Sequence, residues 1–179
     1  YKGTFNRMII KTIDQIYVDS QDDNTENKIK LFSIQHQVVF TSAIRMFRDN
    51  ALFGIGPKMF REKCKEDRYQ VFTELDHSVN GCQTHPHNIY IQLLAETGLF
   101  GTLPIIILFV FLFYQIFIKS LFLKHIYKNK FSNIDILLMS ALFVNLWPII
   151  PTGNFFNNWI TILYFIPIGF LFYNKKINL

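Results

Sequence analysis

The sequence has 179 residues, half of them hydrophobic, and a formal net charge of +5. The length suffices for about one domain, but the apolar residues gather after residue 97, which excludes an ordinary soluble domain. Up to Thr97 there are 12 Lys and Arg against 12 Asp and Glu, whereas the rest of the chain has six Lys and one acidic residue. These six lysines lie outside the apolar runs, and this placement is typical of cytoplasmic loops and not of a nucleic-acid-binding patch. Because the chain begins at Tyr1 in a polar stretch, with no signal peptide, we interpret it as the C-terminal part of a longer membrane protein.

The polar half is expected to contain a helix followed by a turn. From Ile29 to about Asn50 the sequence has no Gly or Pro, and apolar residues recur at helical spacing, which predicts a helix. The segment from Leu52 to Pro57 contains two glycines and a proline, so it predicts the turn that ends this helix. The strongly polar stretch Gln21–Asn27 is interpreted as a variable excursion.

A second helix is predicted to begin in the segment Thr84–Asn88, because Pro86 suits the first helical position. His87 would then lie in the first turn of this helix. The helix is expected to run to Thr97, and Gly98 marks either its end or a bend into the membrane.

Three apolar runs follow, at about residues 99–118, 134–150 and 155–173. The first has 20 residues without a charge and spans about 30 Å at about 1.5 Å per residue, which is the thickness of a bilayer core. The other two are shorter and contain Pro148 and Pro167, so they form either two spans, which we favour, or one re-entrant hairpin. The predicted fold is therefore an all-α, polytopic membrane protein, in which a helical loop region (1–97) precedes a region of two to three transmembrane helices (98–179).

The basic residues predict the orientation of these spans. Lys119–Lys130 lies between the first two runs, and Lys175 and Lys176 follow the third, so both segments are expected to face the cytoplasm. The turn at residues 151–154 and the whole polar half would then lie on the opposite side.

One segment carries the most specific pattern of the sequence. His87 and Asn88 are followed by nine residues, then Gly98, two further residues and Gly101, at the entry to the first apolar run. This pattern resembles the signature of the O-antigen ligase and polymerase family, in which it lies at the end of a large periplasmic loop. The resemblance covers about residues 40–118 well.

The resemblance implies a multi-pass glycosyltransferase of the bacterial inner membrane, with its active site facing the periplasm. The donor would be a glycan linked to undecaprenyl diphosphate, and the acceptor would be lipid A–core in a ligase or another glycan in an O-antigen or exopolysaccharide polymerase. The signature leaves these two open. The family works without metal or nucleotide, so no cofactor is expected, and the partners are membrane lipids and glycans but no nucleic acid. A non-enzymatic transport subunit is the rival class, for which the apolar runs offer only Gln115, Asn145 and Asp135.

His87 is the first predicted catalytic residue. At a helix start the dipole disfavours imidazolium, so a neutral ring would be ready to take a proton from an acceptor hydroxyl, beside N–H groups free to bind a diphosphate. The alternative is a histidine that caps or packs the helix. His85 is expected to point elsewhere on the turn. A metal site that combines both with His77 is disfavoured, because Pro86 separates the pair and no carboxylate partner is evident.

Arg45 is the second predicted catalytic residue, because its helix and the following Gly-x-Gly turn also look like parts of the family. A guanidinium grips a diphosphate bidentately and stays charged, and the resemblance implies a periplasmic arginine on the pyrophosphate of the lipid carrier. The alternative is a solvated surface charge. The turn would bring the Arg45 helix against the His87 helix. The predicted substrate-binding residues are Asn88, Arg48, Gly54, Gly56 and His85.

Two further features are expected to be structural. Cys64 and Cys82 both fall in the predicted periplasmic loop, where the oxidising compartment favours a disulfide over two unpaired thiols. Glu96 shares a helix stripe with Asn88 and Gln92, and we favour a structural role for it over a contact with an acceptor sugar.

Overall fold

The computed structural model describes residues 2–6, 9, 33–71, 81–122 and 132–177. Within these ranges the chain is helical and has no strand, which confirms the all-α prediction; the elements are α1 (Lys2–Phe5), α3 (Ile34–Asp49), α4 (Phe60–Lys63), α5 (Ile89–Phe113), the π-helical segment η2 (Tyr114–Phe122), α6 (Asn133–Asn145) and α7 (Asn158–Ile177). Three features predicted from the sequence lie outside the described residues: the excursion at Gln21–Asn27, His77, and most of the basic loop that precedes α6.

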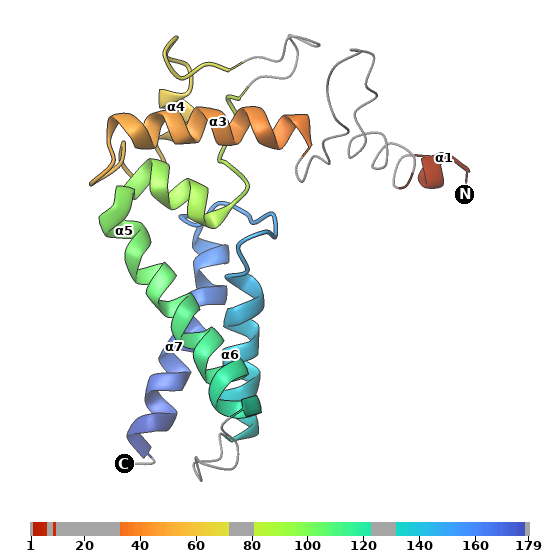
Figure 1. Ribbon diagram of the computed structural model, residues 1–179, viewed down its shortest axis with the longest axis vertical. Coiled ribbons are helices and arrows are strands. Elements are labelled where there is room, and N and C mark those ends of the chain that lie inside the picture. The colour runs from red at the N-terminus through yellow and green to blue at the C-terminus, as the bar shows by residue number, and fades with distance from the viewer. Residues whose placement is uncertain (1, 7–8, 10–32, 72–80, 123–131, 178–179) are drawn as a thin grey trace.

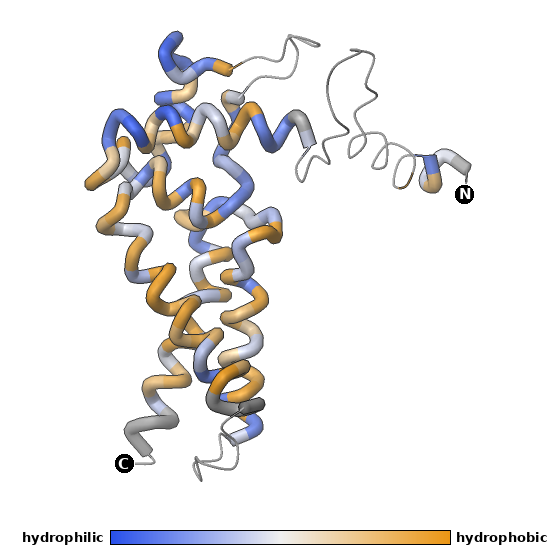
Figure 2. Tube along the Cα trace, in the orientation of Figure 1, coloured by the Kyte–Doolittle hydropathy of each residue, from blue (hydrophilic) through white to orange (hydrophobic). Residues whose placement is uncertain are grey.

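Helices α3 to α7 form two layers. Helix α3 lies across the upper end of a long bundle made by α5, α6 and α7 (Figure 1). The bundle is mostly apolar along its length, whereas the upper layer is mostly polar (Figure 2). Among the described residues, the stretch Ile89–Ile118 is the one helix long and apolar enough to cross a membrane, and it contains the first predicted span.

The second predicted apolar run is helical over only part of its length. Helix α6 begins with a capping box, in which Ser132 and Asp135 satisfy each other's backbone N–H groups. It ends at Asn145, because Pro148 restricts the residue before it and cannot donate to a helix. Its 13 residues cover about 20 Å, less than the core of a bilayer.

Two hydrophobic cores meet on the first part of α5. The upper core joins α3, α4 and α5 and contains Val38, Val39, Ala43, Met46, Phe60, Cys64, Tyr69 and Ala95. The lower core joins α5, α6 and α7 and contains Ile89, Leu93, Leu112, Met139, Leu142, Leu146, Phe155 and Tyr164. Because Leu93 and Ala95 lie on opposite faces of one helix, the start of α5 is held between the polar layer and the bundle.

Helix α5 bends at Gly98, as the sequence allowed. Gly98 has φ +64° and ψ −162°, a region that essentially only glycine occupies. In a straight helix the N–H of Leu99 would bond the carbonyl of Ala95, and the N–H of Phe100 that of Glu96. The bend removes both bonds and leaves four backbone groups to be satisfied.

The turn after α3 supplies all four partners. The N–H groups of Leu99 and Phe100 donate to the carbonyls of Ala51 and Leu52, at 2.8 and 3.2 Å. In return, the N–H groups of Ile55 and Gly56 donate to the carbonyls of Ala95 and Glu96, each at 2.9 Å. We call this four-bond contact the Gly98 junction; it fixes the polar layer on the bundle.

Glycines make the junction possible. A Cβ on Gly98 would lie 2.4 Å from the backbone of Leu52, and a Cβ on Gly54 would lie 2.4 Å from the backbone of Glu96. Gly54 also has a positive φ of +69°. The two backbones therefore approach more closely than side chains would permit.

Candidate functional site

The start of α5 differs from the prediction. The helix begins at Ile89, and Asn88 is its N-cap, with Oδ1 accepting from the N–H groups of Tyr90 and Ile91 at 3.1 and 3.2 Å. The expectation that Pro86 opens the helix and that His87 lies in its first turn is therefore wrong. The capping side chain also occupies two of the N–H groups that were expected to be free for an anion.

His87 lies just before the cap, in a left-handed conformation with φ +56°. A non-glycine residue with positive φ needs support from its surroundings. The loop between α6 and α7 provides it, because the N–H of Thr152 donates to the carbonyl of His87 at 2.9 Å. Two further hydrogen bonds join the two segments: the Asn88 side-chain amide donates to the carbonyl of Pro148 at 2.7 Å, and the Tyr90 hydroxyl donates to the carbonyl of Leu146 at 2.6 Å.

Three histidine rings meet at this point. The ring centroids of His85 and His87 are 4.1 Å apart, so the expectation that His85 points elsewhere is wrong. His36, in the first turn of α3, approaches His87 edge-on with 6.2 Å between ring centroids. His36 is not among the residues predicted from the sequence, although it is a polar residue at the start of the buried face of a predicted helix.

Burial changes the acid–base character of this cluster. The half-buried ring of His87 has its pKa lowered by loss of solvent and then by positive charge at His36. The pKa of His85 is lowered by burial and by charge at His87, against a smaller opposite effect from the backbone of Thr152. The neutral ring expected for His87 is thus favoured at neutral pH, through burial and its histidine neighbour, and not through a place in the first helical turn.

Arg45 lies apart from the histidines. It is nine residues after His36 on α3, which is about 13 Å along the helix and half a turn around it. Its guanidinium is exposed and donates to the carbonyl of Gln70 at 3.0 Å. Arg48 is also exposed. The turn does bring α3 against α5, but it does not bring Arg45 to His87.

The other predicted binding residues have contacts within the chain. Asn88 is 4% exposed and uses its oxygen for the cap and its amide for Pro148. The N–H of Gly56 donates to the carbonyl of Glu96 as part of the Gly98 junction, whereas the N–H of Gly54 donates to the carbonyl of Asn50, and Gly54 lies against the backbone of Glu96. A direct contact of these three residues with substrate stays a prediction.

A chain of buried polar groups connects α4, the start of α5 and the loop between α6 and α7. Glu96 is 1% exposed, and its carboxylate accepts from the N–H of Phe60 and from the amide of Gln92, each at 2.9 Å. The amide of Gln92 also donates to Asn154 Oδ1 at 2.8 Å, and its oxygen accepts from the N–H of Phe155 at 2.9 Å. These contacts match the structural role expected for Glu96.

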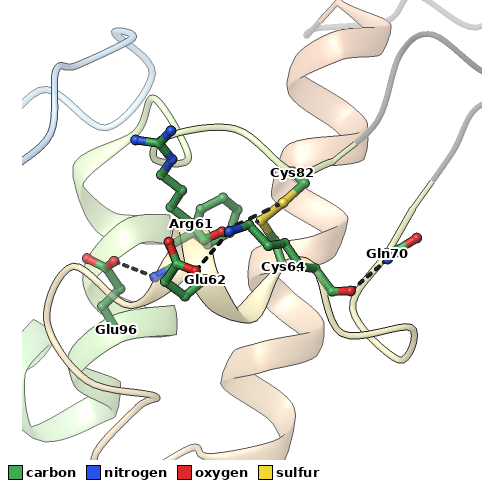
Figure 3. The surroundings of a disulfide bond; sticks show 8 residues. Arg61, Glu62, Cys64, Gln70, Cys82 and Glu96 are labelled. Atoms are coloured by element: carbon green, nitrogen blue, oxygen red, sulfur yellow. Dashed lines mark hydrogen bonds and ion pairs between the residues drawn. A yellow bond between two sulfur atoms is a disulfide. The ribbon is translucent and has the colours of Figure 1, made fainter.

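Cys64 and Cys82 are joined by a disulfide, the pairing expected from the sequence, with 5.1 Å between their Cα atoms. Figure 3 shows the bond where it ties the end of α4 to the segment that leads to His85. Within the described residues, no group of three or more His, Cys, Asp or Glu side chains is arranged to hold a metal ion.

A family model described as O-antigen ligase matches residues 8–106, which is more than half of the chain. The chain belongs to the O-antigen ligase family. No curated protein and no solved structure matches it. The matched range contains α3, the Gly98 junction, the histidine cluster and the start of the long apolar helix.

Membership of the O-antigen ligase family gives the chain a general role. The family is membrane-associated, and its members are glycosyltransferase-like enzymes with ligase or polymerase activity on lipid-linked glycans. The long apolar helix Ile89–Ile118 agrees with a membrane-associated protein.

Proposed function

We propose that this chain carries the catalytic histidine of a glycosyl transfer from undecaprenyl diphosphate to a sugar hydroxyl at the periplasmic face of the inner membrane. The observation that supports it best is His87, a half-buried histidine with a lowered pKa that directly precedes the N-cap of the long apolar helix. A base there stays neutral at the pH of the periplasm and lies at the level where a membrane-anchored diphosphate would meet a polar acceptor.

The proposed step is a substitution at the anomeric carbon of the donor sugar. The neutral ring of His87 takes the proton of the acceptor hydroxyl while the hydroxyl oxygen forms the new glycosidic bond. The bond between the anomeric carbon and the phosphate oxygen breaks, and its electron pair leaves with the lipid diphosphate. No redox partner is needed for this balance.

The proposed topology has three crossings. Helices α5, α6 and α7 run side by side in alternating directions, and the ends of η2 and α7 lie at the end of the bundle opposite α3 (Figure 1). Residues 1–97 would then form a periplasmic loop region, and residues 98–179 the transmembrane region. Labelling of single cysteines in intact cells, in a background without Cys64 and Cys82, tests this, and reaction of position 124 with an impermeant reagent would contradict it.

Diphosphate binding by Arg45 or Arg48 is a separate proposal, because the structure does not place either beside His87. It predicts that Arg45→Ala lowers transfer severely and that Arg45→Lys restores part of it, since an ammonium cannot reproduce a bidentate guanidinium. Normal transfer by Arg45→Ala would remove this residue from the mechanism.

His87→Ala in the full-length protein tests the function. General-base assistance is worth about 10²- to 10⁴-fold in rate, so transfer from lipid-linked donor in vitro should fall by that factor while membrane insertion stays normal. Near-normal transfer would contradict the assignment.

Ligase and polymerase are both kept as candidates, with the ligase preferred. Lipopolysaccharide gels of a deletion strain separate them: lost long chains with accumulating lipid-linked glycan indicate a ligase, and core with a single repeat indicates a polymerase. A transport role has no specific support, because Leu99–Ile118 contains no charged residue that would line a path.

A further inference from the structure

His36 comes from a part of the chain remote from the signature segment, yet it meets His87. The two rings are 6.2 Å apart and nearly perpendicular, at 77°. The ring of His36 is held in place by a 2.7 Å hydrogen bond between Nδ1 and Ser33 Oγ and by Phe40, whose ring centroid is 5.9 Å away. The ring of His36 therefore has a fixed position beside the ring of His87.

Histidine rings and a backbone N–H group contact His87 in the structure. Two titratable side chains contact its ring: His36 from α3 and His85 from its own loop. The loop between α6 and α7 contributes the N–H of Thr152, which is engaged with the His87 carbonyl. Two imidazoles at this separation repel one another when both are protonated, and partial burial weakens the solvent screening of that repulsion.

We propose that His36 is a positioning residue for the reaction: its fixed ring orients His87 and, when it carries a proton, prevents His87 from taking one. His87 then stays the neutral, proton-accepting member of the pair. The link to catalysis rests on the proposed function of His87, but the electrostatic coupling of the two rings does not. The lowered pKa of His87, caused in part by His36, agrees with this coupling.

Substitutions of His36 should shift the acidic limb of the pH–rate profile of transfer, and the direction of the shift should depend on the charge of the new side chain. His36→Gln removes the neighbouring charge, so the pH below which transfer falls should rise by about 0.5 to 2 units, the range for one charge at this separation between water-like and protein-like screening. His36→Arg makes the charge permanent, so that pH should stay at or below the wild-type value. Gln35→Arg is the matched control, because it adds the same charge at an exposed neighbouring position of α3 and should move the limb less.

The titration of His87 itself gives a second readout that does not need activity. NMR of the purified full-length protein with labelled histidines, with the His87 signal assigned by its loss in His87→Gln, should show the same order of midpoints: His36→Gln above wild type, and His36→Arg at or below it. A His87 midpoint that is unchanged or lower in His36→Gln would overturn the proposal. If the midpoints move as expected but His87→Ala remains active, the coupling stands and the proposed function fails instead.

Discussion

The Gly98 junction makes the most direct prediction about the fold. Gly98→Ala should destabilise the protein, although alanine is the better helix former in an ordinary helix. The new Cβ would lie 2.4 Å from the carbonyl carbon and oxygen of Leu52, which are backbone atoms that cannot rotate away. It would also force a side chain into the backbone region at φ +64°, ψ −162°.

The magnitude follows from two contributions. A non-glycine residue in this backbone region costs about 1 to 3 kcal/mol. Moving Leu52 away weakens the two bonds that Leu99 and Phe100 donate, each worth about 0.5 to 1.5 kcal/mol net. The free energy of unfolding should therefore fall by about 2 to 6 kcal/mol, less whatever a straightened α5 recovers by re-forming its internal bonds.

Equilibrium unfolding of the purified protein in mixed micelles measures this difference. Gly169→Ala is the matched control, because it lies within α7 at a position where an added Cβ would meet open space. That variant should stay within about 1 kcal/mol of wild type and on the stabilising side. If Gly98→Ala unfolds like Gly169→Ala, the close backbone contact is not what holds the two layers together.

A double variant tests the same reasoning from the other side. Gly54→Ala meets the backbone of Glu96 at 2.4 Å and should also destabilise. Because both substitutions break one contact, the combination with Gly98→Ala should cost clearly less than the two single costs added. Full additivity would mean that the two glycines act independently.

The remaining predictions concern the site and its supports. Asn88→Ala should lower the free energy of unfolding by about 1 to 2 kcal/mol, since it removes the cap of α5, and Asn88→Asp should retain part of that stability in the same unfolding assay. Joint replacement of Cys64 and Cys82 by Ser should cost about 3 kcal/mol, and mass spectrometry without reduction should detect the linked peptide in the wild type. Folding lowers the pKa values of His85 and His87, so the unfolded chain binds more protons than the folded chain just below pH about 6.5. The free energy of unfolding should therefore decrease as the pH is lowered through that range, and it should decrease less steeply in His85→Gln.

Local sequence signals predicted the elements well. Most of the stretch without Gly or Pro forms α3, which begins at Ile34 after its N-cap Ser33 and not at Ile29; the Gly-x-Gly turn follows it, and α5 bends at Gly98, one of the two outcomes predicted. Each of these depends on backbone preferences of a few adjacent residues. The start of α5 was misplaced because two local rules competed, and the side-chain cap of Asn88 won over the preference of Pro86 for a first helical position.

Contacts between remote segments could not be predicted in the same way. His36 and Arg45 belong to one helix, and only the packing of α3 decides which face meets the signature segment. Val38, Val39, Ala43 and Met46 are buried, so the face carrying Arg45 is turned outward. Residue type alone favours the arginine as a diphosphate ligand, whereas the packing of the buried face brings the histidine at the start of the helix to the signature segment.

The two rings of the site are positioned by different layers, so we expect the Gly98 junction to influence the proposed reaction. His87 is held by the loop between α6 and α7, through Thr152, while His36 is held by the first turn of α3. Their separation therefore depends on how the polar layer sits on the bundle, which the Gly98 junction and the Gln92–Glu96 contacts determine. A variant such as Gly98→Ala touches neither ring, yet it should shift the His87 titration midpoint toward that of His36→Gln. A midpoint that stays at the wild-type value in a measurably destabilised Gly98→Ala protein would show that the rings are held together by contacts other than the junction.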